Sequence, residues 1–313
     1  MTAAEQIQEL EVVRRVDEAE GVVSLQLAAP AGRTLPAWEP GAHIDVVLPD
    51  GSARQYSLHG TGAEWEISVL DVRDGRGGSR WIHANAQEGT ALRVRGPRNH
   101  FALVQAERYI FIAGGIGITP IIAMVREAER RGADWRLVYG GRSRSSMAFA
   151  KELEELGDRV HLVPQDTEGL IDIAEALGAP QAGTAVYCCG PEPLLESVEA
   201  ACQAWPAGTL HVERFSALPV DTSHDGSFEV VAQRTGISAV VPPDRSVLDV
   251  LADHGIDIPT SCGEGVCGTC ETRVLEGEIE HRDALLSDAE RAENTVMMVC
   301  CSRARSARLV LDI

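Results

Sequence analysis

Four cysteines are the residues of this chain whose spacing indicates chemistry most directly. Cys262, Cys267 and Cys270 lie in the stretch SCGEGVCGTCET, and Cys300 follows much later, in VMMVCCSRA. A C-x4-C-x2-C run with a distant fourth cysteine is a spacing that holds a [2Fe–2S] cluster, because each iron needs two thiolates besides the bridging sulfides. A zinc site usually joins two short C-x2-C hooks, and this chain has one. We therefore predict an iron–sulfur cluster instead of zinc or free thiols.

The residues around these cysteines refine the prediction. Gly263, Gly265 and Gly268 separate the first three cysteines, and glycine lets the backbone curl round a cluster and direct N–H groups at its sulfurs. The fourth position has a rival, because Cys300 and Cys301 are adjacent. In an extended strand their side chains would point to opposite faces, so only one could reach the iron.

Two motifs near the N-terminus are suited to a phosphate-bearing cofactor. The first, Arg54-Gln55-Tyr56-Ser57, supplies a permanently charged guanidinium fork. The second, Gly75-Arg76-Gly77-Gly78-Ser79, offers backbone N–H groups and a hydroxyl at the start of a helix predicted over 79–86. An R-x-Y-S sequence alone is often just a strand with a surface arginine. The two motifs together predict a binding site.

Two glycine-containing turns suggest a dinucleotide site. Gly114-Gly115-Ile116-Gly117-Ile118-Thr119-Pro120 follows an apolar strand, and we expect Thr119 to cap the next helix with Pro120 as its first residue. Its glycines would admit a pyrophosphate to the positive end of that helix, although the G-x-G-x-x-G fingerprint is absent. The second turn is Cys189-Gly190-Pro191. Arg142 and Arg144 lie where an adenosine ribose would bind and could favour a 2′-phosphate.

The elements expected to position these residues fall into three groups. The stretch 9–28 alternates apolar and polar residues and is broken by a turn at Glu20–Gly21, and further short strands are expected at 43–48, 54–59, 65–72 and 91–95. Together they predict a closed antiparallel β-barrel. From 108 to 212 strands alternate with helices, including helices at 120–131 and 147–156, which predicts an α/β doubly wound parallel sheet. A polar stretch at 217–226 resembles a linker. The last part predicts a small mixed sheet crossed by a helix at 246–254, an α+β arrangement.

Composition restricts the class of protein. The chain has 313 residues, 44% of them hydrophobic, and a net charge of −19, which disfavours nucleic acid as a partner. No apolar run approaches the length of a membrane span, and the N-terminus lacks the features of a signal peptide, so we expect a cytoplasmic protein without a membrane partner. Eight cysteines in such a chain favour metal or redox use over disulfides.

The motifs together resemble one family. R-x-Y-S, GRGGS, GGIGITP and C-G-P resemble the ferredoxin–NADP reductase superfamily, and the cysteine loop with the following ETRVLEGEIEHRDALLSDAE resembles the ferredoxin domain of the phthalate dioxygenase reductase and vanillate demethylase reductase family. The resemblance implies three domains: an FMN-binding barrel at 1–104, an NAD-binding α/β domain with linker at 105–222, and a β-grasp plant-type [2Fe–2S] ferredoxin domain at 223–313. The GRGGS form favours FMN over FAD, and the family mostly uses NADH.

The resemblance also assigns site residues. It implies catalytic roles for Tyr56 and Ser57 beside the flavin ring and for Cys189 near the nicotinamide. It implies Cys300 as the fourth cluster ligand, with Cys301 a buried neighbour. His281, Asp283 and Leu286 fall on an H-x-D-x-x-L pattern that we interpret as structural. The expected FMN contacts are Arg54, Tyr56, Ser57, Gly77, Gly78, Ser79 and Phe215; the expected NAD contacts are Gly114, Gly115, Gly117, Thr119, Pro120, Arg142, Cys189, Gly190 and Pro191.

The function that follows is electron transfer. The resemblance implies an NADH-dependent oxidoreductase that passes electrons from NADH to FMN, then to [2Fe–2S], then to a partner oxygenase of Rieske type acting on an aromatic or small organic acid. Flavin is suited to this task because it exchanges electrons in pairs or singly, whereas the cluster carries them singly. Two alternatives remain open from the sequence: a reductase for a cytochrome P450, and a non-catalytic iron–sulfur redox sensor.

Overall fold

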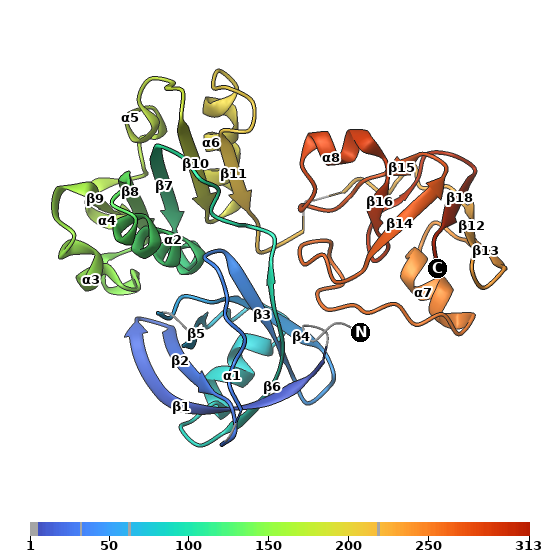
Figure 1. Cartoon of the computed structure of the whole chain (residues 1–313), viewed down its shortest axis with the longest axis horizontal. Helices are drawn as coiled ribbons and strands as arrows, with labels where there is room; N and C mark the ends of the chain where they lie inside the picture. The colour runs from blue at the N-terminus through green and yellow to red at the C-terminus, as the bar shows by residue number, and fades with distance from the viewer. Residues whose placement is uncertain (1–5, 32, 62–63, 218–219) are drawn as a thin grey trace. The chain divides into compact units, whose positions relative to one another are not determined.

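The computed structural model describes residues 6–31, 33–61, 64–217 and 220–313. The chain forms two compact units, Met1–Glu213 and Arg214–Ile313 (Figure 1). Each unit contains its own buried core. Within the described ranges, none of the helices combines the length and apolar character needed to cross a bilayer.

A six-stranded antiparallel sheet forms the first half of the larger unit, in the order β4-β3-β6-β1-β2-β5. It closes because Leu58, just beyond β4, bridges to Ile67 on β5, which confirms the predicted barrel. Alternate residues point inward around Trp65, which is fully buried. The strands are β1 (Gln8–Ala19), β2 (Val22–Ala28), β3 (Ala42–Val47), β4 (Ala53–Ser57), β5 (Trp65–Leu70) and β6 (Ala91–Asn99), and one helix, α1 (Gly78–Asn85), lies beside β4 and β5.

A five-stranded sheet, all parallel, forms the second half of this unit, in the order β11-β10-β7-β8-β9. Its strands are β7 (Arg108–Gly114), β8 (Asp134–Gly141), β9 (Val160–Pro164), β10 (Thr184–Cys189) and β11 (Leu210–Glu213). Its helices are α2 (Ile118–Arg130), α3 (Ala150–Glu154), α4 (Gln165–Glu168), α5 (Ile173–Leu177) and α6 (Glu192–Cys202).

The two faces of this sheet are covered separately, as the alternation of strands and helices predicts. Phe111 and Tyr187 pack in one core cluster with residues of α2, whereas Ile110 and Val186 pack in another with residues of α5 and α6. This is the doubly wound arrangement, and it leaves the carboxyl ends of the strands free to carry turns.

Specific contacts join the barrel to the parallel sheet within the larger unit. Arg126 on α2 donates a hydrogen bond to the carbonyl of His59 and forms a bidentate pair with Glu152. The ring of Phe149 meets that of His59 edge-on, with ring centroids 4.9 Å apart. Burial lowers the pKa of His59 to about 3, and the Arg126 charge adds to that effect. His59 is therefore a neutral core residue that fixes the position of the barrel against α2.

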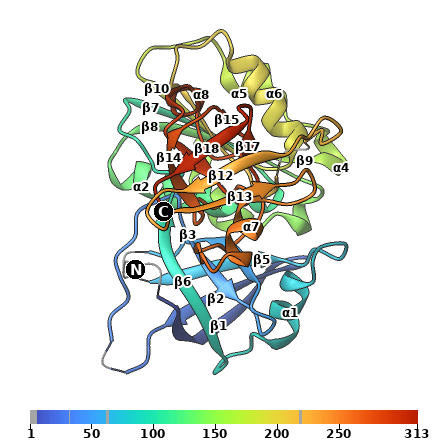
Figure 2. The ribbon, with the colours of Figure 1, turned by 90° about the vertical axis from the view of Figure 1, so that its right-hand side faces the viewer.

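The second unit is a mixed sheet with the order β13-β12-β18-β14-β16, in which β12 and β18 run parallel and the other neighbours antiparallel. Helix α7 (Val247–Asp253) packs beside β13 (Figure 2). The remaining elements are β12 (Phe228–Ala232), β13 (Ile237–Val241), β14 (Glu271–Glu276), β15 (Ile279–Glu280), α8 (Asp288–Glu293), β16 (Val296–Met298), β17 (Arg303–Ala304) and β18 (Arg308–Leu311). This agrees with the predicted α+β domain.

Two local predictions were wrong. The helix expected at 147–156 is confined to α3, because Met147, Ala148 and Phe149 are all buried in the core and Phe149 takes a left-handed conformation with φ 58°. The helix expected to begin at Pro120 begins at Ile118, so Thr119 lies inside it. The Thr119 hydroxyl donates to the carbonyl of Ile116 instead of capping the helix. Positions 218 and 219 of the expected linker lie outside the described residues.

Candidate redox-cofactor sites

The cysteine loop has the geometry expected for holding sulfur ligands. Gly263, Gly265 and Gly268 have φ of 71°, 74° and 70°, a region that glycine adopts without strain. The backbone N–H of Glu264 donates to Cys262 Sγ at 3.2 Å. Thr269 likewise donates its N–H to Cys267 Sγ at 3.4 Å. Glycine thus turns the chain so that its N–H groups face sulfur, as a thiolate-bound cluster requires.

The fourth cysteine reaches the same place from a distant segment. The Cys262 thiol interacts with the thiols of Cys267 and Cys300, and the Cys270 thiol also interacts with that of Cys300. All four residues are at most 9% exposed. They come from a loop and from the turn after β16, so the structure brings together the four residues that the spacing singled out.

Alternation along an extended strand was expected to separate the side chains of Cys300 and Cys301, but a different feature of the structure separates them. Strand β16 ends at Met298, and the chain then turns, with the N–H groups of Cys301 and Ser302 both donating to the Met298 carbonyl. The alternation of an extended strand therefore does not separate the two cysteines. Instead the Cys301 thiol lies against Gly265, where a side chain on the glycine would overlap it. Cys300 is the one whose thiol meets both Cys262 and Cys270.

Within the described residues, no group of three or more His, Cys, Asp or Glu side chains surrounds a single ion position. This is compatible with the convergence of the four cysteine thiols, because each iron of a [2Fe–2S] cluster receives only two protein thiolates. The donor set, four buried sulfurs with N–H groups directed at two of them, fits that cluster.

The barrel motifs meet at the start of α1. Arg54 on β4 lies so close to Gly78 that a Cβ there would be 2.6 Å from Arg54 Cγ. The Arg54 guanidinium donates to the carbonyls of Ala53 and Arg76, at 2.8 and 3.3 Å. Gly77 precedes the helix with φ 84°, and no side chain caps the first turn. An arginine and an uncapped helix N-terminus thus lie together, which fits a flavin phosphate.

The other expected flavin residues are distributed around this point. Tyr56 shares the face of β4 with Arg54 and packs on the barrel core, and burial raises its pKa. Ser57 is the last residue of β4 and pairs across the strands with His43, on the opposite face. The Ser79 hydroxyl accepts a hydrogen bond from the Val72 N–H at 3.1 Å. Phe215 is the second residue of the second unit and is 46% exposed; its contact with the flavin stays a prediction.

The two nucleotide turns pack directly on each other at the carboxyl ends of β7 and β10. A Cβ on Gly114 would lie 2.7 Å from Pro191 Cδ, and one on Gly117 would overlap the carbonyl of Cys189. The Tyr139 hydroxyl donates to the Gly115 carbonyl at 3.1 Å. The glycines are therefore needed for turn-to-turn packing, in addition to any role in admitting a pyrophosphate.

The two arginines beside the expected ribose position differ in their partners. Arg144 NH2 is 2.6 Å from a carboxylate oxygen of Glu154, so its charge is already balanced. The backbone carbonyl of Arg142 accepts the N–H of Asp166, and its side chain is exposed. A 2′-phosphate would therefore meet fewer available charges than the sequence alone suggested, which favours NADH.

Glu213 is a functional candidate that the sequence motifs did not reveal. It is the last residue of β11 and lies in register with Cys189 on β10, so the two side chains share a face. Its Oε2 is buried without a hydrogen-bond partner among the described residues. Burial raises the pKa of Glu213 to about 8, and burial followed by the Glu213 charge raises the pKa of Cys189. A buried carboxyl at the end of a short strand leaves no spacing signal, so only the fold exposes it.

Known proteins resemble this chain over its whole length. Residues 111–200 match the oxidoreductase NAD-binding domain family, and residues 230–305 match the 2Fe-2S iron-sulfur cluster binding domain family. A vanillate O-demethylase oxidoreductase of Pseudomonas putida is 44% identical over 312 residues, 96% of this chain and 98% of that protein. The solved structure of phthalate dioxygenase reductase is 37% identical, with a TM-score of 0.71 and 98% of each chain covered.

This chain belongs to the phthalate dioxygenase reductase family. The fold of the family, with its flavin, nucleotide and ferredoxin parts, accounts for both units described above. A solved type IV self-sufficient cytochrome P450 monooxygenase is also 43% identical, with a TM-score of 0.92, and matches 98% of this chain but only 41% of that protein.

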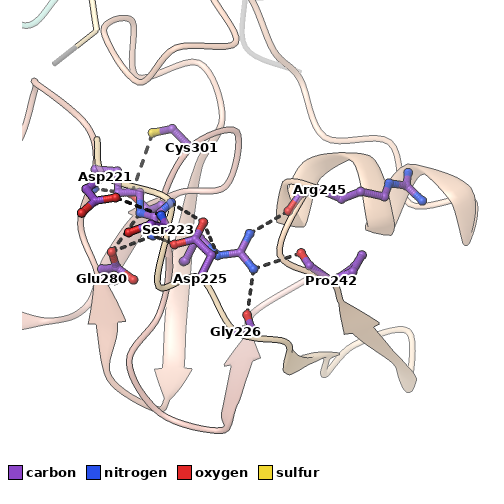
Figure 3. Close-up of polar contacts among 11 residues, drawn as sticks. Asp221, Ser223, Asp225, Gly226, Pro242, Arg245, Glu280 and Cys301 are labelled. Carbon is purple, nitrogen blue, oxygen red and sulfur yellow. Dashed lines mark hydrogen bonds and ion pairs between the residues drawn. The ribbon is translucent and has the colours of Figure 1, made fainter. Parts of the chain in front are cut away.

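In this family member a buried charge network anchors the chain where it enters the second unit. Asp225 forms a bidentate pair with Arg282, at 2.5 and 2.9 Å, and its Oδ2 is 3.5 Å from Arg303 Nε. Arg303 also donates to the carbonyls of Gly226, Pro242 and Arg245 (Figure 3). The Arg282 N–H donates to Ser302 Oγ at 3.2 Å. The network thus fastens the entering segment to the turn that carries Cys300.

The raised pKa of Glu213 predicts a specific pH dependence of stability. Its ordinary pKa is 4.5 and its folded pKa is about 8, so the folded protein binds the proton more tightly. The stabilisation is fully present below 4.5 and is lost as pH rises toward 8. The Glu213→Gln variant has no ionisable group at this position, so it should not show this loss of stability with rising pH. Denaturant unfolding of the wild type and the variant should be measured from pH 4.5 to 8.5. The difference between their free energies of unfolding should change by a few kcal/mol over this range, on the order of the energy that the pKa shift implies. A constant difference would show that Glu213 is solvated.

Proposed function

We propose that this protein is an NADH-dependent electron-transfer reductase that uses FMN and a [2Fe–2S] cluster to supply electrons to a partner oxygenase. The observation that carries the proposal is the convergence of Cys262, Cys267, Cys270 and Cys300 in a chain that also contains an NAD-binding domain. Bound together, FMN and the cluster convert the electron pair of NADH into single-electron transfers.

The chain's own residues have distinct roles in this proposal. Arg54 and the first N–H groups of α1 hold the flavin phosphate, with Gly77, Gly78 and Ser79 forming the turn. Tyr56, Ser57 and Phe215 contact the flavin ring. The Gly114–Pro120 and Cys189–Pro191 turns hold the dinucleotide, and Cys189 and Glu213 lie on the nicotinamide side. Domain boundaries near residues 104 and 222 and a cytoplasmic location are part of the same proposal.

The partner is an oxygenase, and two classes of oxygenase are candidates. The relatives named as oxidoreductases of vanillate O-demethylase and phthalate dioxygenase systems favour a Rieske-type partner that acts on an aromatic acid. The likeness to part of a solved self-sufficient cytochrome P450 monooxygenase favours a haem partner. The protein itself would not bind the substrate of either oxygenase.

One experiment tests the function as a whole. The purified protein should release FMN on acid treatment, contain acid-labile sulfide, and reduce cytochrome c with NADH. Combining it with the oxygenase encoded beside its gene should make substrate oxidation depend on NADH. Release of FAD, or zinc without sulfide, would reject the cofactor assignment, and the presence of both cofactors without NADH-driven reduction of cytochrome c would reject the reductase.

The flavin assignment makes a prediction for Arg54→Ala. Charge-assisted hydrogen bonds contribute roughly 1.5–3 kcal/mol each, so the dissociation constant for FMN should rise by about tenfold or more. The unfolding midpoint of the flavin-free protein should stay close to that of the wild type. Arg93→Ala, which changes an exposed arginine on strand β6, separated from β4 by β3, is the matched control and should bind FMN normally. Equal affinity in Arg54→Ala and Arg93→Ala would contradict the assignment.

The assignment of the fourth ligand makes a prediction for two adjacent cysteines. Cys300→Ser should abolish or shift the visible absorption of the cluster and stop reduction of cytochrome c, while NADH-dependent ferricyanide reduction persists. Cys301→Ala should keep both activities, because that thiol packs against Gly265. The reverse pattern in the two variants would make Cys301 the ligand.

A further inference from the structure

The strand order of the parallel sheet fixes the direction in which a dinucleotide would lie across it. From β7 the chain runs outward to β8 and then to the edge strand β9, and it returns to β10 on the other side of β7 (Figure 1). Ligands of doubly wound sheets bind at the carboxyl ends of the strands, where the strand order reverses. Here the order reverses between β7 and β10, and the two nucleotide turns pack on each other at that point.

The two halves of the dinucleotide therefore lie on opposite sides of the Gly114–Pro120 turn. This step rests on the proposed function, in which that turn holds the pyrophosphate and Cys189, at the end of β10, lies on the nicotinamide side. The adenosine half then extends the other way, over the carboxyl ends of β8 and β9. Neighbouring strands are about 4.8 Å apart, so the adenosine ribose reaches the segments that follow these two strands.

These two segments meet at Arg142 and Asp166. Strands β8 and β9 pair as far as their last residues, Gly141 and Pro164. Just beyond them, the backbone N–H of Asp166 donates to the Arg142 carbonyl at 3.2 Å. Both side chains are exposed, and neither forms an ion pair or a side-chain hydrogen bond with any residue that the structure describes. The fold thus brings an unpaired carboxylate and an unpaired guanidinium to the same end of the sheet.

The other charged groups close to this point already have partners. Arg144 Nη2 lies 2.6 Å from a carboxylate oxygen of Glu154. Glu168, in the same short helix as Asp166, lies 3.4 Å from His161 Nε2. Among these acidic residues, Asp166 is therefore the one whose carboxylate is available to a ligand at the carboxyl ends of β8 and β9.

The chemistry of the ribose decides what such a carboxylate does. The adenosine ribose of NADH carries two neighbouring hydroxyls that can donate to a carboxylate, whereas in NADPH a phosphate replaces the 2′-hydroxyl. Beside that phosphate the carboxylate would lose a hydrogen bond and meet a like charge. We propose that Asp166 binds the ribose hydroxyls of NADH and rejects the 2′-phosphate of NADPH, so that it sets the nucleotide specificity of this reductase.

Arg142 explains why a carboxylate is needed at this position. An exposed guanidinium offers a 2′-phosphate the charge-assisted contact that arginine forms readily. Asp166, whose backbone is bonded to that of Arg142, offsets this charge, and the two residues together favour a neutral diol. Removal of the carboxylate should therefore let the phosphate bind, and removal of the guanidinium as well should cancel that gain.

The test compares the two nucleotides in the full-length holoprotein, with ferricyanide as the electron acceptor. The wild type should have the higher kcat/KM with NADH. In Asp166→Asn the ratio of kcat/KM for NADPH to that for NADH should rise by about tenfold or more. The KM for NADH should rise several-fold with kcat unchanged, because the lost contact is remote from the hydride. Adenosine 2′,5′-bisphosphate should become a stronger competitive inhibitor and 5′-AMP a weaker one, which locates the change at the ribose.

Two further variants separate the possible outcomes. Asp158→Asn removes an exposed carboxylate just before the amino end of β9, and its ratio should equal that of the wild type. Arg142→Leu, added to Asp166→Asn, should reverse the gain with NADPH. Equal use of both nucleotides by the wild type, or equal ratios in the Asp166 and Asp158 variants, would overturn this inference alone. A wild type that oxidises neither nucleotide would overturn the proposed function, and this inference with it.

Discussion

Close approach of a second chain segment at a glycine is a constraint shared by the flavin, nucleotide and cysteine motifs of this protein. A Cβ on Gly78 would meet Arg54, one on Gly117 would meet the Cys189 carbonyl, and one on Gly265 would meet Asp283 Cα at 2.9 Å. Each glycine therefore brings a second segment, distant in sequence, against a turn. A side chain at any of these positions would force the segments apart. Each glycine therefore fixes both the packing of the two segments and the positions of the binding residues that they carry.

The larger unit shows how this local constraint extends to the whole fold. The Gly114–Pro120 turn sits on the Cys189 turn, and the helix that follows it, α2, carries Arg126 to the His59 carbonyl of the barrel. His59 stays neutral because it is buried, so the contact persists across the physiological pH range. The N-terminus of α2 thus positions the two nucleotide turns, and Arg126, further along the same helix, positions the barrel that carries Arg54. A flavin and a nicotinamide must approach each other closely for hydride transfer, and a single packed unit meets that requirement.

Much of the fold could be predicted from the sequence, because strand alternation and the βα pattern are local signals. The barrel, the parallel sheet and the mixed sheet all appear within a few residues of the expected positions, as does the convergence of the four cysteines. The failures share a physical cause. Burial of Met147–Phe149 overrode helical propensity, and the chain after Met298 turned instead of continuing extended. The Asp225 network and the Cys189–Glu213 pair also had no sequence signal, because they join residues that only the fold brings together.

The H-x-D-x-x-L segment shows how one buried carboxylate can organise the backbone around it. One carboxylate oxygen of Asp283 accepts two backbone N–H groups, and the imidazole of His281 lies 3.7 Å from the other oxygen. Folding selects polar residues that satisfy their neighbours, because an unpaired buried group lowers stability by roughly 1–3 kcal/mol. For Asp283 the partners are these two backbone N–H groups, and the turn that it builds lets the Ala284 N–H donate to the Gly265 carbonyl, which connects this segment to the loop holding the cysteines.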